Sequence, residues 1–369
     1  MNKEKNGAIV FVLPLFEEGG AEKTIAAILS GLADNGMDVH LIVMQDKVTL
    51  KIPNHVHLHI LEDSFIRKIP QVIQKKILSF KLRKLVEIIE PAVVFTSLPR
   101  AHKLVARTFN NREDVYYIFH NTPSPSLSKK AFSRMLGIYK LHRLYNGKNI
   151  ITLSNGIRHD ILQTLDVKAN EIAVINNPFE IEEIKKMAQE SVDDLPSNDF
   201  VVCVSHFYKR KRHDILIKSY KASGIKALLV LLGERGEMEK VQQLVKQENL
   251  EDKVIFLGWK SNPYPYIDKA KLLVLSSDEE GMPRAVVEGL ILHTPVVSTD
   301  CPSGPNEVLV GDLKHYLVPT GDVKKLAETM KDALNSYPEI MDEMTVRFSK
   351  DYVVAKYVDL IAKVKQKKQ

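Results

Sequence analysis

The sequence predicts an α/β protein of two domains, each built on a doubly wound parallel sheet. The chain has 369 residues, which is too long for one ordinary α/β domain and sufficient for two. Its composition, 44% hydrophobic and 27% charged, is typical of a folded chain rather than a disordered one. Short apolar runs alternate with helical patterns, and this alternation restarts near residue 200, which favours one parallel sheet in each half.

The first half contains five apolar runs of strand length. The expected strands are residues 8–13, 39–44, 92–96, 115–119 and 150–153. After the first run, apolar residues from Ala21 to Leu32 recur at helical spacing, and Gly36 is placed to end that helix. Ser154 suits the N-cap of a helix that runs to about Leu165.

The second half repeats this organisation. Its expected strands are residues 200–204, 227–232, 254–257, 272–275 and 296–299. A charged helix at 182–190 and a polar run at 191–199 separate the halves. We therefore predict domains at residues 1–180 and 181–345, and expect a helix at 346–369 to pack back on the first domain. Ligands of open α/β sheets bind at the carboxyl ends of the strands, so we expect an interdomain cleft lined by residues that follow strands.

Charge is distributed unevenly along the chain. The net charge is +6, but residues 64–149 hold seventeen Lys or Arg and four acids, so this stretch carries +13 and the remainder −7. Such asymmetry indicates a polyanionic partner, which could be anionic lipid, a lipid pyrophosphate or nucleic acid, or else a solvated helical face. Predicted helices at 65–89 and 127–145 combine apolar and basic residues. We expect each apolar stripe to face the core, so the prediction that these helices lie on an anionic membrane rests on their cations.

The N-terminal sequence and the cysteines bear on location. The segment of the first six residues is charged, and the apolar run at 8–15 is too short for an export signal. No stretch approaches the length of a membrane span. Cys203 and Cys301 make no disulfide framework and have no partner at metal-ligand spacing. We expect a cytoplasmic protein whose membrane contact is peripheral, on the inner face of the cell membrane.

Residues 276–289 contain the most informative segment. A strand is followed by an acidic loop and then by a helix, with Pro283 expected in the first helical turn. The free N–H groups of that turn can hold a diphosphate. Glu280 in the loop can accept hydrogen bonds from sugar hydroxyls, and Glu288 on the helix from ribose hydroxyls. The alternative is that Glu280 only caps the helix and Glu288 lies on the surface.

Two further loops follow predicted strands. The basic segment 205–214 can neutralise a diphosphate leaving group as its charge develops, or it can be a basic loop of the kind that contacts nucleic acid. The paired Gly19 and Gly20 let backbone approach a phosphate or sugar and open a helix. They form neither a dinucleotide fingerprint nor a Walker motif. His120 also follows a strand, where a lone histidine is commonly structural.

These motifs resemble those of the family-4 retaining glycosyltransferases. The hallmark of that family is Glu-x7-Glu in a phrase much like Ser-x-x-Glu-Gly-Phe-Pro, and Glu280 and Glu288 fit it, with Gly281 and Pro283 in register and Met282 at the usual aromatic position. The resemblance covers nearly the whole chain and is strongest over 276–309. It implies the GT-B fold, with two Rossmann-like domains.

The resemblance also implies residue roles. Glu280 would contact the transferred sugar and Glu288 the nucleotide ribose; Gly19 and Gly20 would lie beside the phosphates and sugar, and His120 would reach sugar hydroxyls. Lys211 matches a family lysine. The family's Gly-Arg is replaced by Ser205-His206, so either His206 or Arg210 substitutes for the arginine, or phosphate binding is weaker.

Two less specific matches resemble the family's turns that contact the nucleotide. They are Gly233, after the strand that ends at residue 232, and Lys260, whose backbone could read the base edge.

The function that follows is transfer, with retention, of a hexose or N-acetylhexosamine from a nucleotide diphosphate sugar, UDP favoured over GDP, to a lipid-linked or cell-surface glycan. No cofactor and no metal are expected, because cations and helix dipoles supply the charge and no Asp-x-Asp motif stands in a suitable loop. The alternatives are a nucleotide-sugar 2-epimerase and a non-catalytic nucleotide-sugar-binding protein. A nucleic-acid partner is not expected, since no basic platform with interleaved aromatics is present.

Overall fold

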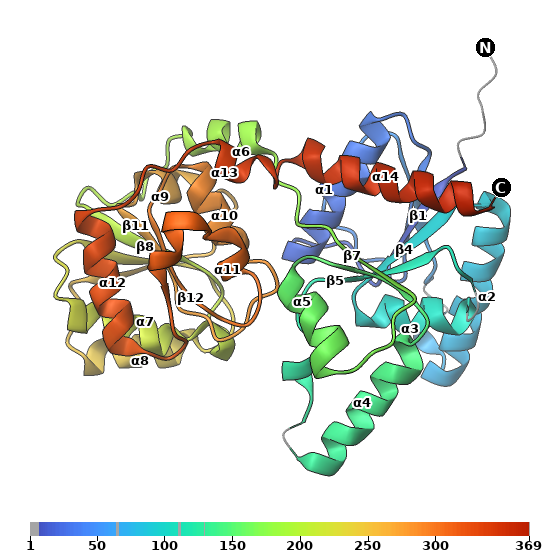
Figure 1. The fold of residues 1–369 in the computed structure, drawn as a ribbon, viewed down its shortest axis with the longest axis horizontal. Helices are drawn as coiled ribbons and strands as arrows, with labels where there is room; N and C mark the ends of the chain where they lie inside the picture. The colour runs from blue at the N-terminus through green and yellow to red at the C-terminus, as the bar shows by residue number, and fades with distance from the viewer. Residues whose placement is uncertain (1–6, 64–65, 110–111, 129, 369) are drawn as a thin grey trace. The chain divides into compact units, whose positions relative to one another are not determined.

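The computed structural model describes residues 7–63, 66–109, 112–128 and 130–368. The chain forms two compact units, each with its own parallel sheet (Figure 1). Unit 1 consists of Met1–Pro178 and Lys350–Gln369, and unit 2 of Phe179–Ser349. The expectation of two doubly wound α/β domains is confirmed.

Unit 1 contains a seven-stranded sheet in the order β3-β2-β1-β4-β5-β6-β7, with every pair parallel. The central strands are buried along their whole length, which explains their continuous apolar sequence. The strands are β1 (Ile9–Leu13), β2 (Val39–Val43), β3 (Val56–Ile60), β4 (Val93–Ser97), β5 (Val115–Phe119), β6 (Asn149–Thr152) and β7 (Glu171–Val174).

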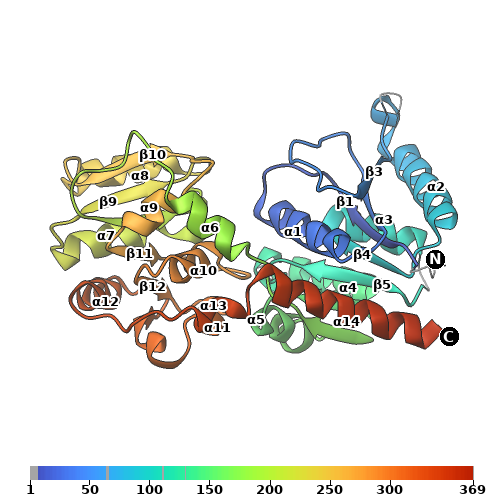
Figure 2. The same cartoon turned by 90° about the horizontal axis from the view of Figure 1, so that it is seen from above.

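The helices of unit 1 include the C-terminal segment of the chain. They are α1 (Gly20–Asp34), α2 (Gln71–Ile89), α3 (Pro99–Thr108), α4 (Ala131–Tyr145), α5 (Asn155–His159), which a π-helical turn (Asp160–Thr164) continues, and α14 (Lys350–Lys368). Helix α14 runs beside α1 (Figures 1 and 2), and a Cβ on Gly31 would lie 2.4 Å from Val354. Tyr357 of α14 is fully buried, edge-on to Phe95 of β4 at 5.5 Å between ring centroids. The last helix therefore completes the core of unit 1.

Unit 2 contains six parallel strands in the order β10-β9-β8-β11-β12-β13, a Rossmann-like arrangement. The strands are β8 (Phe200–Val204), β9 (Leu228–Leu232), β10 (Val254–Gly258), β11 (Leu272–Leu275), β12 (Val296–Thr299) and β13 (Leu317–Val318). The helices are α6 (Ile181–Ala188), α7 (His213–Ser223), α8 (Met238–Gln247), α9 (Tyr264–Lys269), α10 (Arg284–Ile291), α11 (Pro305–Val308), α12 (Val323–Asn335) and α13 (Glu343–Val346). Helices α7 and α12 pack side by side on this sheet (Figure 1).

Several local predictions are confirmed and others need correction. Ser154 caps α5 by accepting a hydrogen bond from Ile157 N at 3.2 Å, and Gly36 follows α1 with a φ of +72°. The helix expected at 65–89 begins only at Gln71, because Pro70 separates it from a 3₁₀ turn at Ile66–Lys68. Residue 65 itself lies outside the described residues. The helix expected from residue 127 begins at Ala131.

The apolar residues of the two basic helices behave differently. On α2, Leu78, Leu82 and Val86 are buried, whereas Val72 and Ile73 of the predicted apolar stripe are 70% and 49% exposed. On α4 the apolar stripe at helical spacing is exposed instead; it consists of Phe132, Met135, Leu136 and Tyr139. The expectation that the apolar residues of this helix face the core therefore holds for the buried Tyr145 and fails for these four. Among the helices that the structure describes, none combines the length and hydropathy needed to cross a membrane.

Candidate functional site

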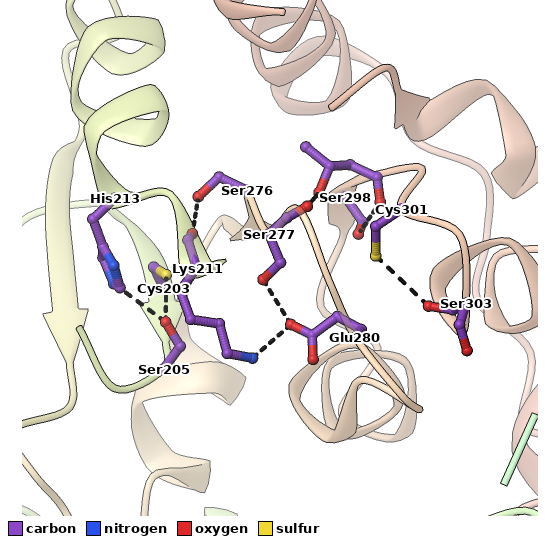
Figure 3. Close-up of polar contacts among 11 residues, drawn as sticks. Cys203, Ser205, Lys211, His213, Ser276, Ser277, Glu280, Ser298, Cys301 and Ser303 are labelled. Atoms are coloured by element: carbon purple, nitrogen blue, oxygen red, sulfur yellow. Dashed lines mark hydrogen bonds and ion pairs between the residues drawn. The ribbon is translucent and has the colours of Figure 1, made fainter. Parts of the chain in front are cut away.

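An ion pair at the carboxyl edge of the unit 2 sheet joins two of the predicted site residues. Lys211 ends a 3₁₀ turn (Lys209–Lys211) after β8, and Glu280 lies in the loop between β11 and α10. Strands β8 and β11 are parallel neighbours, so both loops emerge at the same edge. Lys211 Nζ lies 2.5 Å from Glu280 Oε1, and the two side chains are 15% and 9% exposed (Figure 3). The pair is thus largely removed from water.

Ser277 gives the carboxylate of Glu280 a second partner. Its hydroxyl donates to Oε1 at 2.6 Å, so the two donors meet on one carboxylate oxygen (Figure 3). Thr299 of β12 donates in turn to the backbone oxygen of Ser277 at 2.5 Å. Among the described residues, none donates a hydrogen bond to Glu280 Oε2. Glu280 does not cap α10; it is held by side chains and keeps one oxygen available to a ligand.

Backbone contacts fix the basic loop against the acidic one. The Ser276 hydroxyl donates to the carbonyl oxygen of Lys211 at 2.9 Å, and Asp278 N donates to the carbonyl oxygen of Arg210 at 2.8 Å. Arg212, at a φ of +50°, pairs with Asp278 at 2.8 Å and with Asp214 at 2.9 Å. The guanidinium of Arg212 therefore ties the two loops together, while the Lys211 ammonium faces the Glu280 carboxylate.

His206 and Gly233 lie against each other at the same edge. His206 Nδ1 is 2.8 Å from the carbonyl oxygen of Glu234 and donates to it in the tautomer that leaves Nε2 as an acceptor. Gly233 has a φ of +152°, and a Cβ there would lie 2.1 Å from the carbonyl oxygen of Ser205. Glycine is required at this position because the backbone after β9 passes directly over the backbone after β8. Arg210 is exposed beside the ring of Tyr208.

The second acid of the motif is buried on α10. Glu288 is 7% exposed and pairs with Arg284 at 3.3 Å, while the Arg284 guanidinium also lies 4.4 Å from the Phe179 ring centroid. The alternative of a surface position for Glu288 is excluded. Pro283 is the N-cap of α10, so the prediction that it lies within the first turn is off by one residue.

The neighbours of this helix start are also defined. Gly281 accepts a hydrogen bond on its backbone oxygen from Ser303 at 2.9 Å, and Met282 is buried. Gly304, at a φ of +96°, approaches Pro283 so closely that a Cβ would lie 2.6 Å from it. Lys260 follows β10, and its ammonium pairs with Asp194, which also accepts from Tyr266. The side chain of Lys260 thus has a partner within unit 2. The predicted contact with the base edge is one made by the backbone of Lys260, and it stays a prediction.

Two cysteines and one histidine beside the ion pair are uncharged at neutral pH. Burial raises the pKa of Cys203 to about 11 and that of Cys301 to about 12, so both remain thiols. Burial, together with the nearby Lys211 charge, lowers the pKa of His213 to about 4. His213 lies 3.2 Å from the Ser205 hydroxyl, and Cys203 lies 3.8 Å from that hydroxyl (Figure 3). Neither the thiols nor this imidazole therefore adds a charge beside the Lys211–Glu280 ion pair at neutral pH.

Gly19, Gly20 and His120 belong to unit 1. Gly19 is the N-cap of α1 and Gly20 its first residue. The carboxylate of Glu22 lies over Gly19, so a Cβ added to Gly19 would lie 2.2 Å from Glu22 Oε2. Burial raises the pKa of Glu22. Removal from water lowers the pKa of His120 to about 4, and its Nε2 lies 2.8 Å from the Ser97 hydroxyl at the end of β4. His120 is therefore a neutral hydrogen-bonding group.

Sequence reasoning missed the residues that position these groups. Ser277, Thr299 and the Arg212–Asp278 pair hold the two loops in place. Ser277 stands three residues before Glu280, a short-range signal that could have been used. Arg212 and Asp278 are 66 positions apart, and only the adjacency of β8 and β11 brings them together.

Comparison with known proteins extends over both units. The model described as Glycosyltransferase Family 4 matches residues 18–183, and the model described as Glycosyl transferases group 1 matches residues 187–351. A Campylobacter jejuni protein, N-acetylgalactosamine-N,N'-diacetylbacillosaminyl-diphospho-undecaprenol 4-alpha-N-acetylgalactosaminyltransferase, is 29% identical over 336 residues, which are 90% of each chain.

Solved structures share the fold of the whole chain. A glycosyltransferase from Rickettsia africae aligns with a TM-score of 0.76 at 15% identity and covers 97% of this chain and 98% of that one. Anabaena HepE in complex with UDP aligns with a TM-score of 0.70 at 18% identity and covers 98% of both chains. Each unit is Rossmann-like, and the fold is GT-B. With both family models matched in sequence order along one chain, this protein belongs to the family-4 glycosyltransferases.

Proposed function

We propose that this glycosyltransferase moves a hexose or N-acetylhexosamine from a nucleotide diphosphate sugar to a lipid-linked or cell-surface glycan, with retention at the sugar carbon. UDP is favoured over GDP as the donor nucleotide. The observation that carries the proposal is the buried Lys211–Glu280 pair at the carboxyl edge of the unit 2 sheet, with His206, Gly233 and α10 around it. HepE, of the same fold, binds UDP, and the Campylobacter jejuni relative acts on a diphospho-undecaprenol acceptor, as their names state.

Charge explains what these residues do in the proposed reaction. As the bond between the sugar carbon and the diphosphate oxygen breaks, negative charge grows on the diphosphate, and a preorganised cation in a site poor in water stabilises it strongly. Lys211 provides that cation. The acceptor oxygen attacks the same face of the sugar and gives its proton to the departing diphosphate, so no enzyme nucleophile is needed. The positive end of α10 provides further stabilisation beside Gly281, Met282 and Pro283.

The remaining candidate residues would recognise the donor by hydrogen bonds. Glu280 Oε2 and the neutral His120 would accept from or donate to sugar hydroxyls, and Glu288 would accept from the ribose. The exposed Arg210 would take the place of the family arginine near the phosphates, or else His206 would do so as an imidazolium, in which Nε2 also carries a proton to donate. Gly19 and Gly20 would bring the start of α1 close to the donor.

The first test separates binding from transfer. Melting temperatures are measured with UDP, GDP, ADP and their sugars, because a ligand that binds only the native state raises the melting point. Glu280→Gln should then abolish transfer while nucleotide binding falls only modestly. Glu239→Gln, a substitution on the surface helix α8, is the control and should retain both. Full transfer by Glu280→Gln would remove Glu280 from the mechanism.

The same assay distinguishes the alternatives. Donor incubated without acceptor yields an epimer if the protein is a 2-epimerase, and nucleotide binding without transfer or donor hydrolysis indicates a non-catalytic binding protein. Product NMR reports the anomeric configuration, and inversion would contradict the retaining mechanism. Transfer should persist in a metal chelator; loss that added magnesium restores would contradict the proposed metal independence.

We also propose that α4 docks unit 1 on an anionic membrane at the inner face of the cell membrane. Its exposed stripe includes Phe132 at 68%, Met135 at 58% and Tyr139 at 62% exposure. Arg134, Lys140 and Arg143 lie on the same helix. Apolar side chains that enter the headgroup region beside cations that attract anionic lipid form an interfacial helix.

Vesicle sedimentation tests this docking. The protein should pellet with vesicles that contain phosphatidylglycerol, less with pure phosphatidylcholine, and less at high salt. Phe132→Ser with Met135→Ser should reduce the bound fraction. Met341→Ser, which changes an exposed apolar residue of unit 2, should not. Equal binding to both kinds of vesicle, or by the α4 variant, would contradict the proposal.

A further inference from the structure

Four residues with metal-ligating side chains meet on one face of the edge of the unit 1 sheet. Asp38 and His40 alternate at the start of β2, and His57 and His59 alternate on the edge strand β3. His40 and His57 are register partners in the parallel pair, as are Ile42 and His59. Because side chains two residues apart on a strand share a face, all four project from the same side.

The distances within this cluster suit a metal ion. Asp38 Oδ1 lies 3.1 Å from His40 Nε2 and 3.5 Å from His57 Nε2, and the ligand atoms of these three residues lie within 4.8 Å of one another. A tetrahedral zinc with bonds of about 2.0–2.1 Å holds neighbouring ligand atoms roughly 3.3–3.4 Å apart. The two measured separations bracket that value. Small side-chain movements would therefore seat an ion.

His59 stands where a supporting residue of a metal site belongs. Its Nε2 lies 3.0 Å from His40 Nδ1, and the two rings stack with centroids 5.2 Å apart. A histidine that binds metal through one ring nitrogen characteristically uses the other in a hydrogen bond that fixes its orientation. In the tautomer with its proton on Nδ1, His40 donates from Nδ1 to His59 Nε2. The lone pair of His40 Nε2 then points towards Asp38 and His57 and can bind a metal ion.

We propose that Asp38, His40 and His57 bind a divalent transition metal of the zinc class, with His59 as a positioning residue. Two imidazoles and a carboxylate suit zinc, copper or nickel rather than magnesium or calcium. His57 is 62% and Asp38 52% exposed, so an ion can enter from solvent and water can complete its coordination. The metal would join β3, the edge strand beside β2, to the rest of the sheet. The site is structural, and none of its residues belongs to the proposed transfer machinery.

A competing explanation is that hydrogen bonds alone hold the cluster together. His40 and His57 can each donate a hydrogen bond to Asp38. Polar side chains on an edge strand also oppose edge-to-edge aggregation. This explanation predicts the same arrangement without any metal affinity. The two explanations therefore differ in a measurable quantity, the binding of one metal equivalent.

Calorimetric titration with zinc chloride tests the site in full-length protein that carries no histidine tag and has been stripped with chelator. We expect one saturable equivalent and a rise in melting temperature. His57→Ala should remove this equivalent, and His59→Ala should weaken it by about 10- to 100-fold. His315→Ala is the matched control, because His315 is similarly exposed at 63% and lies 2.6 Å from Asp332 in unit 2.

Cobalt(II) provides a second measurement. Ligand-field absorption bands should appear in the wild-type protein and be absent in His57→Ala, while melting curves without metal show that the exposed His57 is not needed for folding. Three results would overturn the proposal: no saturable zinc binding, undiminished binding by His57→Ala, or an equal loss in His315→Ala. The readouts are independent of transfer.

Discussion

The loops that follow the strands of unit 2 differ in charge from those of unit 1. After β8 and β11 the residues form ion pairs: Lys211 pairs with Glu280, and Arg212 pairs with Asp278. After β1 and β5 the candidate residues are Gly19, Gly20 and a histidine whose pKa of about 4 keeps it neutral. The two units thus have similar sheets but different charged groups after the strands that carry the candidate residues.

This difference indicates a division of work between two units of similar fold. A diphosphate gains charge in the reaction, and it needs cations that are already in place. A sugar is neutral, and it needs hydrogen-bonding groups and close backbone approach instead. In the proposed function the fold provides the sheet edge, and the loop residues would determine which part of the donor each unit serves. Four predictions test this division.

The largest expected effect is that of Lys211→Ala. Loss of one preorganised electrostatic contact should lower kcat by about 10²- to 10³-fold, because the leaving diphosphate then lacks its cation. Steady-state transfer kinetics measure this. Lys209→Ala, an exposed neighbour in the same turn, is the control and should stay within a few-fold of wild type. If Lys211→Ala retains most of its kcat, the charged edge of unit 2 is not where the leaving group is stabilised.

Gly233→Ala tests whether close backbone packing maintains this edge. The φ of +152° and the 2.1 Å approach to the Ser205 carbonyl oxygen leave no room for a Cβ, so the free energy of unfolding should fall by about 3 kcal/mol. Urea denaturation measures the loss. Gly258→Ala is the control: its φ is +71°, but a Cβ there meets open space, and the loss should be about 1 kcal/mol. Equal losses would show that the close approach is not decisive.

The buried strands of both sheets could be predicted closely from sequence, whereas of the four edge strands β10 alone was predicted. Continuous apolar runs predicted 115–119, 200–204, 272–275 and 296–299 at the observed bounds. The strands β3, β7 and β13 were not predicted. The β3 strand alternates valine, leucine and isoleucine with histidines and is exposed on both faces, and β13 has only two residues. Edge strands bury little, so their sequences carry a weak apolar signal.

The candidate site could also be predicted only in part from the sequence. Lys211 and Glu280 were recognisable because each follows an apolar run and belongs to a family phrase. Their pairing at 2.5 Å depends on the strand order, in which β8 lies between β9 and β11. The sequence does not show that β8 and β11 are neighbours. The proposed roles of Gly19, Gly20 and His120 remain predictions, as does the cleft between the domains.

The pH dependence of stability tests the neutral histidines. His120 in unit 1 and His213 in unit 2 have pKa values of about 4, below the 6.5 of an unfolded histidine, so the unfolded chain binds more protons between these values. Stability should therefore fall as pH drops from 6.5 towards 4, by about 1–2 kcal/mol per histidine at pH 5. Denaturation at pH 7 and pH 5 should show a smaller fall in His120→Gln and in His213→Gln. His315→Gln is the exposed control, and a fall identical to wild type in all three variants would contradict the assignment.

The smallest expected effect concerns Lys260, where side chain and backbone make separate predictions. Its ammonium already pairs with Asp194, a partly exposed ion pair of the kind that contributes at most about 1 kcal/mol. Lys260→Ala should therefore lower the free energy of unfolding by less than that and leave the dissociation constant for UDP unchanged, because the backbone is the proposed contact. Asp194→Asn is the control for the ion pair and should show a similar small loss of stability. A tenfold weaker affinity for UDP in Lys260→Ala, but not in Asp194→Asn, would show that the ammonium itself contacts the nucleotide and would add a further cation to the charged edge of unit 2.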